Sequence, residues 1–320
     1  MSALLSRSAE CVFWLARYIE RAENLARILE VQETFARDSR GSHDWGILLA
    51  INSDQKRFFE RNTEVTAATV LRFYVTDREN PSSITSNIAF ARENARALRP
   101  LISTEMWTQL NVFYNHVTAL RAGELAEERV AKFCAMIKEG CDAHAGITLG
   151  TFYRDEAWCF YQLGAAIECA DQTTRLLDAK FLSLASRDDD AEPGSAADIS
   201  YWTALLRSAA GYQAFRRRHP RGMNGEQVAA FMLCDPSFPR SVVCNVGSVQ
   251  QQLERLRRHY NLRATTTALE HLDGLQDDLE IKKVKAAMAR GGIHQLDDFI
   301  QRSLNELTRL LGRAFFGHPA

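Results

Sequence analysis

The chain has 320 residues, of which 46% are hydrophobic and 25% are charged, and its formal net charge is −1. A chain of this length can bury about 75% of the surface that it exposes when unfolded, so a large core is possible. A net charge near zero excludes a general attraction to nucleic acid or to an anionic membrane surface, and we expect neither as a partner.

The cysteines and the N-terminal residues bear on where the protein is located. Seven cysteines are scattered along the chain and form no Cys-x-x-Cys pair, which favours reduced thiols in a cytoplasmic protein. The apolar run Cys11–Ala16 is short and is bracketed by charges, so we expect neither a signal peptide nor a membrane span.

The clearest expected element is a helix over Val12–Val31, which lacks Gly and Pro. One side of it is a wide apolar stripe at helical spacing. The other side mixes polar and apolar side chains: Arg17, Glu20, Asn24, Arg27, Phe13, Ile28 and Val31. Such a mixture does not suit full exposure to water, so we predict a polar strip that is buried between helices.

A second copy of this helix is predicted over Gln162–Ala179, at an offset of 148 residues, as from Glu20 to Glu168. Both copies keep an acid, an amide and an arginine at positions i, i+4 and i+7, which share one helical face. The first copy carries the fuller charge cluster, because Cys169 stands in the second copy where the first has Arg21.

The remaining sequence also predicts helices, separated by Pro, Gly and polar breaks. Pro81 requires an extended turn, after which Ser82 or Ser83 is expected to cap a helix through Ala97. Further helices are predicted over approximately 104–117, 125–137, 201–218, 226–233, 248–260, 262–289 and 294–316, and apolar spacing also runs from 47 towards 73. The glycine-containing stretch Glu139–Gly150 is expected to lead out of one helix towards the second copy.

No stretch shows the sustained alternation of a strand, so the fold class is all-α. We expect a single multi-helix bundle with weak internal duplication of the Glu-Arg helix. Within this one domain, 1–320, we distinguish a first half, 1–185, an exposed acidic linker, 186–200, and a second half, 201–320.

Taken together, the motifs resemble the alpha-E family, a bacterial all-helical domain named for a Glu-Arg motif. The matches span nearly the whole chain: Glu20 and Arg21 with Glu23, Asn24 and Arg27; Asn80–Ile84; Ala91–Asn94 with Arg96; Glu105–Trp107; Glu168, Asp171 and Arg175; and Phe238–Ser241. Cys169 departs from the resemblance, since the second copy in this family often reads Glu-Arg as well. Family members look like companions of ATP-grasp ligases and transglutaminase-like proteins, which implies a part in peptide or amide-bond synthesis and modification.

The Glu-Arg cluster of the first helix has two interpretations. Its members are Arg17, Glu20, Arg21, Glu23, Asn24 and Arg27. As a structural feature it would be a buried ion-pair network that fixes helix packing. As a site it would bind a carboxylate or phosphate through guanidinium groups, with Glu20 as the candidate catalytic, proton-transferring residue.

Further candidate site residues lie in short motifs: Asn80, Ser82, Ser83, Arg92, Glu93, Asn94, Arg96, Glu168, Asp171, Arg175, Arg240 and Ser241. The Asn-Pro-Ser-Ser turn is expected to cap a helix, or alternatively to hold an anion. The Phe-Pro-Arg-Ser turn is expected to dock Arg240 onto a carboxylate, or alternatively to contact a substrate. The Arg-Glu-Asn group that begins at Arg92 could join the same central network.

We expect no metal and no cofactor, because no histidine has an acid three residues before it and the Cys and His spacings fit no zinc site. The basic run Arg216–His219 with Arg221 is expected to be a solvated helix end.

Three functions remain open. The first is an auxiliary helical protein that binds a partner enzyme of the ATP-grasp or transglutaminase type, or its peptide substrate. The alternative is a stand-alone enzyme that acts on a small carboxylate or a peptide at the Glu20 cluster, and a weaker alternative is a structural protein that only oligomerises. A closed, fully paired network favours the first, and a polar cavity with unpaired Arg groups favours the second.

Overall fold

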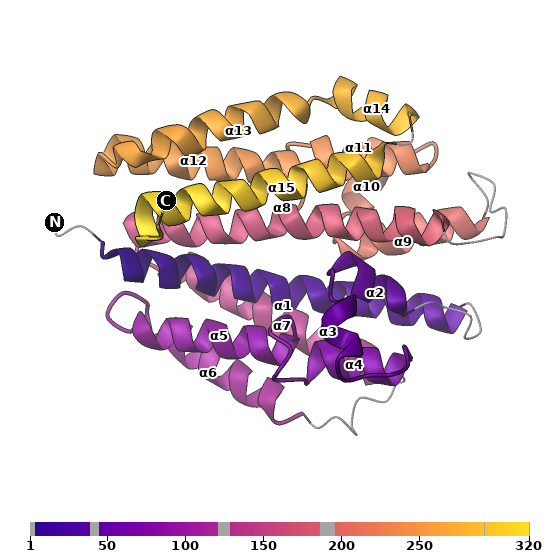
Figure 1. The fold of residues 1–320 in the computed structure, drawn as a ribbon, viewed down its shortest axis with the longest axis horizontal. Coiled ribbons are helices and arrows are strands. Elements are labelled where there is room, and N and C mark those ends of the chain that lie inside the picture. The colour runs from indigo at the N-terminus through magenta and orange to yellow at the C-terminus, as the bar shows by residue number, and fades with distance from the viewer. Residues whose placement is uncertain (1–3, 39–44, 121–128, 186–195, 291, 320) are drawn as a thin grey trace.

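Figure 1 shows the fold in a computed structural model, which describes residues 4–38, 45–120, 129–185, 196–290 and 292–319. The protein is 79% helical, and no strand occurs in these ranges. The prediction of an all-α fold is therefore confirmed. None of the helices described is both long enough and apolar enough to cross a membrane.

Two long helices lie side by side through the middle of the molecule: α1, Ser6–Asp38, and α8, Glu156–Ala185 (Figure 1). Two contacts show that they run parallel. The N–H of Leu4 donates to Glu156 near the start of both helices, and Arg21 donates to Glu168 several turns further along each of them.

The polar strip of α1 lies between helices, as predicted. Phe13 is fully buried, and the charged Arg17 and the apolar Ile28 are each only 5% exposed. A surface helix would leave this side in water, so the burial reflects a second layer of helices packed on α1.

Each long helix anchors its own bundle, so the two structural halves divide before α8: the first half ends with α7, and the second half begins with α8. Helix α1 packs against α5 (Ile84–Ala97) and α7 (Val130–Thr151), and α6 (Thr104–Thr118) packs on both. Helix α8 packs in the same way against α12 (Val242–Tyr260) and α15 (Ile293–Leu311), with α13 (Thr266–Asp278) on both. Figure 1 shows the two sets on opposite sides of the α1–α8 layer. The buried apolar side chains of both halves form one continuous core.

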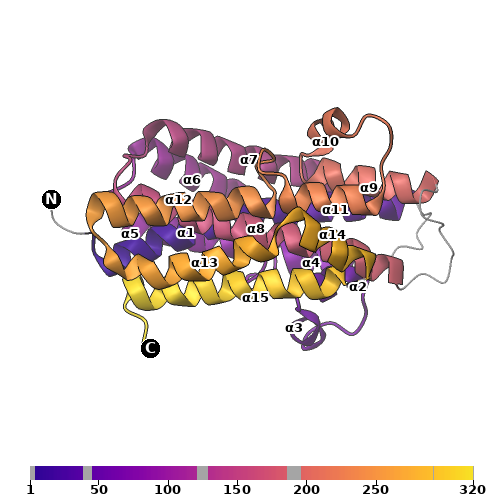
Figure 2. The same ribbon diagram turned by 90° about the horizontal axis from the view of Figure 1, so that it is seen from above.

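One short helix of each half packs on the long helix of the other half. The remaining elements are α2 (Gly46–Ile51), α3 (Gln55–Phe59), α4 (Ala67–Val75), α9 (Ala196–Ser208), α10 (Tyr212–Arg218), α11 (Gly225–Cys234), α14 (Ile281–Ala289), a 3₁₀ turn at Arg263–Thr265 and a π turn at Gly312–Phe316. Helix α2 packs on α8, whereas α9 packs on α1. In Figure 2, α3 and α10 protrude on opposite sides of the molecule. An approximate two-fold axis parallel to α1 and α8 would produce this arrangement.

The internal duplication is confirmed and extends to α5 and α12. Both helices begin with the pattern Pro-x-Ser-(Ile/Val)-x-x-Asn, at an offset of 158 residues, as from Ser83 to Ser241. The hydroxyl of each serine accepts a backbone N–H three residues later at 3.1 Å, so each serine is the N-cap. Asn87 and Asn245 each donate to the carbonyl of the capping serine at 2.8 Å.

Several predicted boundaries are wrong. The stretch Glu139–Gly150 does not leave the helix but continues α7 to Thr151. Gly140 within it provides room for the ring of Phe113, since a Cβ at this position would lie 2.3 Å from that ring. The segment from 47 to 73 forms three short helices, and the segment 262–289 breaks between α13 and α14.

The predicted linker 186–200 falls in two parts. Residues 186–195 lie outside those that the structure describes. The last five, Ala196–Ser200, are helical and open α9 instead of forming a linker. The same helix buries Trp202, which is 1% exposed, and this anchor holds the preceding turn in helical form.

The closest approach of α1 and α8 occurs at Gly164. A Cβ on Gly164 would lie 2.2 Å from the carbonyl oxygen of Phe13 and 3.3 Å from the Cβ of Ala16, its counterpart in the first copy. Because the obstacle is backbone, no side-chain rotation can relieve the contact. Gly164 therefore sets how closely the two long helices meet.

We predict that Gly164→Ala lowers the free energy of unfolding by about 2 kcal/mol, because α1 and α8 must move apart. The matched control is Gly146→Ala on α7, where an added Cβ meets nothing within 4 Å. This control is expected to be neutral or more stable, since Ala favours a helix over Gly. Urea unfolding of the two variants measures the difference, and equal stabilities would contradict the inferred contact.

Burial of His144 on α7 predicts a pH dependence. Burial lowers its pKa to about 4, so the folded protein holds it neutral. The unfolded chain takes up this proton below about pH 6.5, and the free energy of unfolding therefore falls as the pH drops from about 6.5 to about 4. Between pH 7.5 and 5 we expect His144→Gln to lose about 2 kcal/mol less than the natural chain in urea unfolding. The same loss in both proteins would refute this assignment.

Candidate functional site

The buried carboxylate of Glu168 joins α8 to α1. Its side chain is fully buried, and Arg17 and Arg21 each donate to it from Nε at 2.7 Å. Arg21 adds a second bond through Nη2 at 2.9 Å, and Gln172 donates to the same carboxylate at 3.1 Å. Arg17 in turn donates to the hydroxyl of Thr308 on α15. One acid thereby connects three helices.

The equivalent acid of the first copy, Glu20, is held by an arginine from far along the chain. Arg240 donates to Glu20 at 2.9 Å and also pairs with Glu23. Asn24 donates to Glu20 at 2.8 Å, as Gln172 does to Glu168. The prediction that the Phe-Pro-Arg-Ser turn docks Arg240 onto a carboxylate is confirmed.

One further arginine closes each half of the network in the same way. Arg27 pairs with Glu23 one turn earlier and donates to the carbonyl of Ser208, the last residue of α9. Arg175 pairs with Asp171 and donates to the carbonyl of Ile51, the last residue of α2. Each arginine therefore caps the short helix that the other half contributes.

Electrostatics separate the two equivalent acids. Burial alone would raise the pKa of Glu168, but the charges of Arg21 and Arg17 outweigh it and hold the pKa below its usual range. Burial raises the pKa of Glu20, with Arg240 opposing the rise and the nearby Glu23 adding to it. Glu168 is thus the more firmly ionised of the two.

The two halves differ at one pair of positions. Beside Glu20, Cys169 of α8 contacts the guanidinium of Arg240 at 3.9 Å. Beside Glu168, the residue equivalent to Cys169 is Arg21, and the residue equivalent to Arg240 is Ser82. Beside Glu20 the arginine therefore comes from the turn and the small residue from a long helix, whereas the reverse holds beside Glu168. A cavity of about 130 Å³ lies at this place. Its lining contains five of the predicted site residues: Arg21, Ser82, Glu168, Asp171 and Arg175.

The other predicted residues have structural or separate roles. Asn80 shapes the turn by donating to Phe73 and accepting the N–H of Ser82, while Ser83 and Ser241 are helix caps. Arg92 donates to Asn111 and pairs with its neighbour Glu93.

The group that follows Arg92 does not join the central network. Arg96 pairs with the half-exposed Glu93 on the outer side of α5. Asn94 lines a different surface cavity together with Tyr18 and Phe90. The ion pairs and hydrogen bonds of Arg92 and Arg96 are made within α5 and to α6, and not to Glu20 or Glu168.

Sequence reasoning missed three residues of this region. Thr308 contacts Arg17, while Asn52 and Gln172 line the cavity. The repeated Pro-x-Ser-(Ile/Val)-x-x-Asn pattern was the available signal for the cavity, because it aligns Ser82 with Arg240. Nothing in the sequence marks Thr308, since it reaches Arg17 only through the packing of α15.

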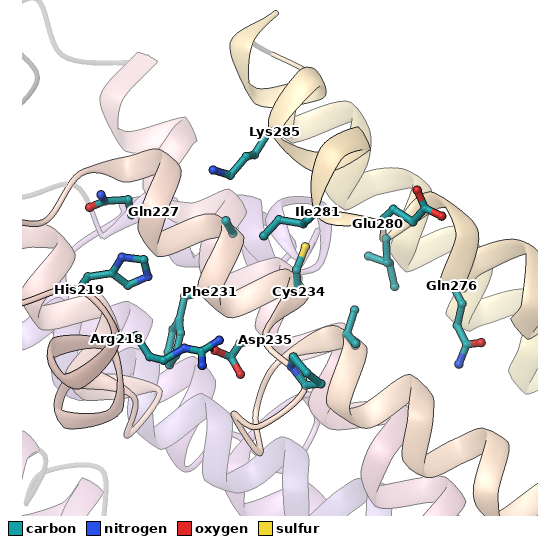
Figure 3. A pocket seen from close by; sticks show the side chains of 14 residues that line it. Arg218, His219, Gln227, Phe231, Cys234, Asp235, Gln276, Glu280, Ile281 and Lys285 are labelled. Atoms are coloured by element: carbon teal, nitrogen blue, oxygen red, sulfur yellow. The ribbon is translucent and has the colours of Figure 1, made fainter.

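A larger cavity, about 570 Å³, lies elsewhere, between α11 and the α13–α14 junction (Figure 3). Phe231, Cys234 and the exposed Ile281 line it, and Arg218 pairs with Asp235 at 3.3 Å on its edge. The basic run is the exposed end of α10, as predicted. Within the residues described, no group of three His, Cys, Asp or Glu side chains is placed to hold a metal.

We predict that Glu168→Gln lowers the free energy of unfolding by about 3 to 5 kcal/mol, because Arg17 and Arg21 would stay buried without their anion. The matched control, Glu93→Gln, removes an exposed acid of the same length and is expected to cost less than about 1 kcal/mol. Thermal and urea unfolding test both variants. A similar cost for the two would mean that the Glu168 network does not hold the halves together.

Comparison with known proteins agrees with this geometry. Uncharacterized proteins of Mycobacterium bovis and Mycobacterium tuberculosis are 23% identical over 333 residues, which covers 94% of this chain but 36% of each relative. The chain thus spans about a third of the length of these relatives. No solved structure matches it. Residues 4–316 match the family model of Alpha-E, described as a predicted alpha-helical domain with a conserved ER motif. The chain belongs to the Alpha-E family.

Proposed function

We propose that this protein is an auxiliary helical module that binds a partner enzyme and is not itself the catalyst. The observation that carries the proposal is the pairing of every acid in the Glu-Arg network, although Arg21 and Arg175 of that network line a small polar cavity. Each of its acids, Glu20, Glu23, Glu168 and Asp171, is paired with at least one arginine, and most of its bonds run between helices. Such a network holds helices in register instead of presenting a reactive group.

The alternative of a stand-alone enzyme with Glu20 as the proton-transfer group has less support. The side chain of Glu20 is 17% exposed, and Oε1 already accepts bonds from Arg240 and Asn24. The cavity at the network is lined by Glu168, which the neighbouring arginines keep ionised, and not by Glu20. A general acid or base needs a proton that it can exchange near neutral pH.

The partner class comes from the family resemblance and not from geometry. The resemblance implies that Alpha-E proteins accompany ATP-grasp ligases and transglutaminase-like proteins. We therefore propose a cytoplasmic partner of one of these two types, which acts on peptides or amide bonds. The mycobacterial relatives support a modular role, since the matched region is only 36% of their length. In them the helical region is one part of a longer chain.

We place the groove for such a partner at the cavity between α11 and the α13–α14 junction. It is lined by apolar Phe231, Leu279 and Ile281, and Ile281 keeps 52% of its surface exposed. An exposed isoleucine on the wall of a cavity of about 570 Å³ is a feature of contact surfaces.

Affinity capture from the native host, with the full chain as bait and mass spectrometry as readout, tests this proposal. We expect an ATP-grasp or transglutaminase-like protein with the natural chain, and its loss with Ile281→Asp. The matched control is Val112→Asp on α6, which adds the same charge at a 49% exposed apolar residue in the other half. Arg240 is unsuitable for this test, because its removal would break the network.

Two results would oppose the proposal. If the natural chain captures neither protein class, the proposed partner is wrong. If Ile281→Asp captures the partner as well as the natural chain does, the proposed groove is wrong.

A further inference from the structure

The cavity beside Glu168, which we name the Ser82 cavity, is a small polar site that the structure does not fill. Its lining comes from α1, α5 with its preceding turn, α8 and the turn after α2: Arg21, Leu25, Asn52, Ser82, Glu168, Asp171, Gln172 and Arg175. We propose that the Ser82 cavity binds a small monocarboxylate through Arg21 and Arg175. This site is independent of the partner proposed above.

The approximate two-fold relation explains why the cavity exists. In the first half, the guanidinium of Arg240 occupies the equivalent space and donates to Glu20 and Asn24. Beside Glu168, the turn before α5 supplies the shorter Ser82, and Arg21 of the long helix donates to the acid instead. A cavity of about 130 Å³ lies between these groups. The space is therefore bounded by charged and polar side chains, and is not a packing defect among apolar ones.

Two guanidinium groups keep free donors at this cavity. Arg21 uses Nε and Nη2 on Glu168, which leaves Nη1 without a partner among the described residues. Arg175 uses Nε on Asp171 and Nη1 on Ile51, which leaves Nη2. Their side chains keep 28% and 21% of their surface exposed, so a ligand can reach them from solvent. A carboxylate has two oxygens and can accept from both groups at once.

The charge balance favours one negative charge. In the first half, Glu20 and Glu23 face Arg27 and Arg240, and the charges cancel.

In the second half, Glu168 and Asp171 face three arginines, Arg17, Arg21 and Arg175. The neighbouring Asp54 does not supply the missing anion, because it is paired with Arg57 at 3.0 Å. A bound monoanion would restore the balance seen in the first half, whereas a doubly charged phosphate would exceed it.

The volume restricts the ligand to a few heavy atoms, as in acetate, propionate or a small amino acid. Asp171 would distinguish an amino acid from a simple carboxylate. Its Oδ2 accepts the bond from Arg175, while Oδ1 has no partner within the described chain and could accept an ammonium group. Simple carboxylates and small α-amino acids share the carboxylate, so both belong in the test.

Isothermal titration calorimetry on the full chain, with acetate, propionate, glycine and alanine as probes and inorganic phosphate and methylammonium as controls, tests the proposal. We expect at least one carboxylate to bind, and phosphate and methylammonium to bind more weakly. Tighter binding of alanine than of propionate would identify an amino acid as the ligand, through Asp171. Equal binding would identify the carboxylate alone.

Ser82→Arg is the decisive variant, because it places a guanidinium where Arg240 lies in the other half. We expect it to fold and to weaken carboxylate binding at least about tenfold, equivalent to about 1.4 kcal/mol. Thr267→Arg on the exposed face of α13 adds the same charge elsewhere and serves as the matched control. If Ser82→Arg does not fold, Arg21→Lys keeps the charge while removing Nη1, and the same loss is expected.

Three outcomes would overturn the proposal: no binding of any carboxylate by the natural chain, undiminished binding by Ser82→Arg, or tighter binding of phosphate than of every carboxylate.

Discussion

The structure depends on one buried charge, the carboxylate of Glu168. A carboxylate removed from water is unfavourable unless hydrogen bonds and opposite charges replace the lost hydration. Here that replacement comes from Arg17 and Arg21 of another helix, so the acid is satisfied only when α1 and α8 lie at one relative height. Apolar contact between two helices permits sliding by a residue or more, but these short, directed bonds do not. The Glu-Arg motif thereby fixes the register on which every other helix packs.

Around this contact the molecule is nearly two-fold symmetric, and its departures from symmetry are the informative parts. The caps, the amide-acid bonds and the helix-capping arginines are matched in both halves. The exchange of Arg21 and Ser82 for Cys169 and Arg240 is not. Each pair supplies one arginine, but the cavity lies beside Glu168 and not beside Glu20. The additional positive charge beside Glu168 comes from Arg17, whose counterpart in the second copy is Ala165. A duplicated frame can in this way keep one copy for stability while the other acquires a binding site.

Much of the fold was predictable because helical spacing and capping are local properties. The Glu-Arg helix, its second copy and the cap at Ser83 follow from residues within a few turns of one another, and all three are present. The continuation of α7 through Gly140 was not predictable, since the glycine serves the ring of a residue on another helix.

The same distinction separates what could be foreseen at the site. That Arg240 would find a carboxylate followed from its turn, but which carboxylate depended on how helices 220 residues apart in sequence meet. The group at Arg92 has the same residue types as the central cluster and yet lies outside it. Composition along a helix identifies a polar face, but only packing determines what that face meets.

The long reach of Arg240 also has a consequence during synthesis. Glu20 and Glu23 leave the ribosome early, whereas their partner follows about 220 residues later, and Arg27 waits for Ser208. At typical translation speeds of about 5 to 20 residues per second, this delay lasts from about ten to forty seconds. Throughout that time Glu20 lacks the guanidinium that pairs with it in the complete protein. Arg17 and Arg21 likewise have no partner until Glu168 is made. The nascent N-terminal half is therefore an open intermediate with unpaired charges of both signs on α1, and its final closure belongs to the completed chain.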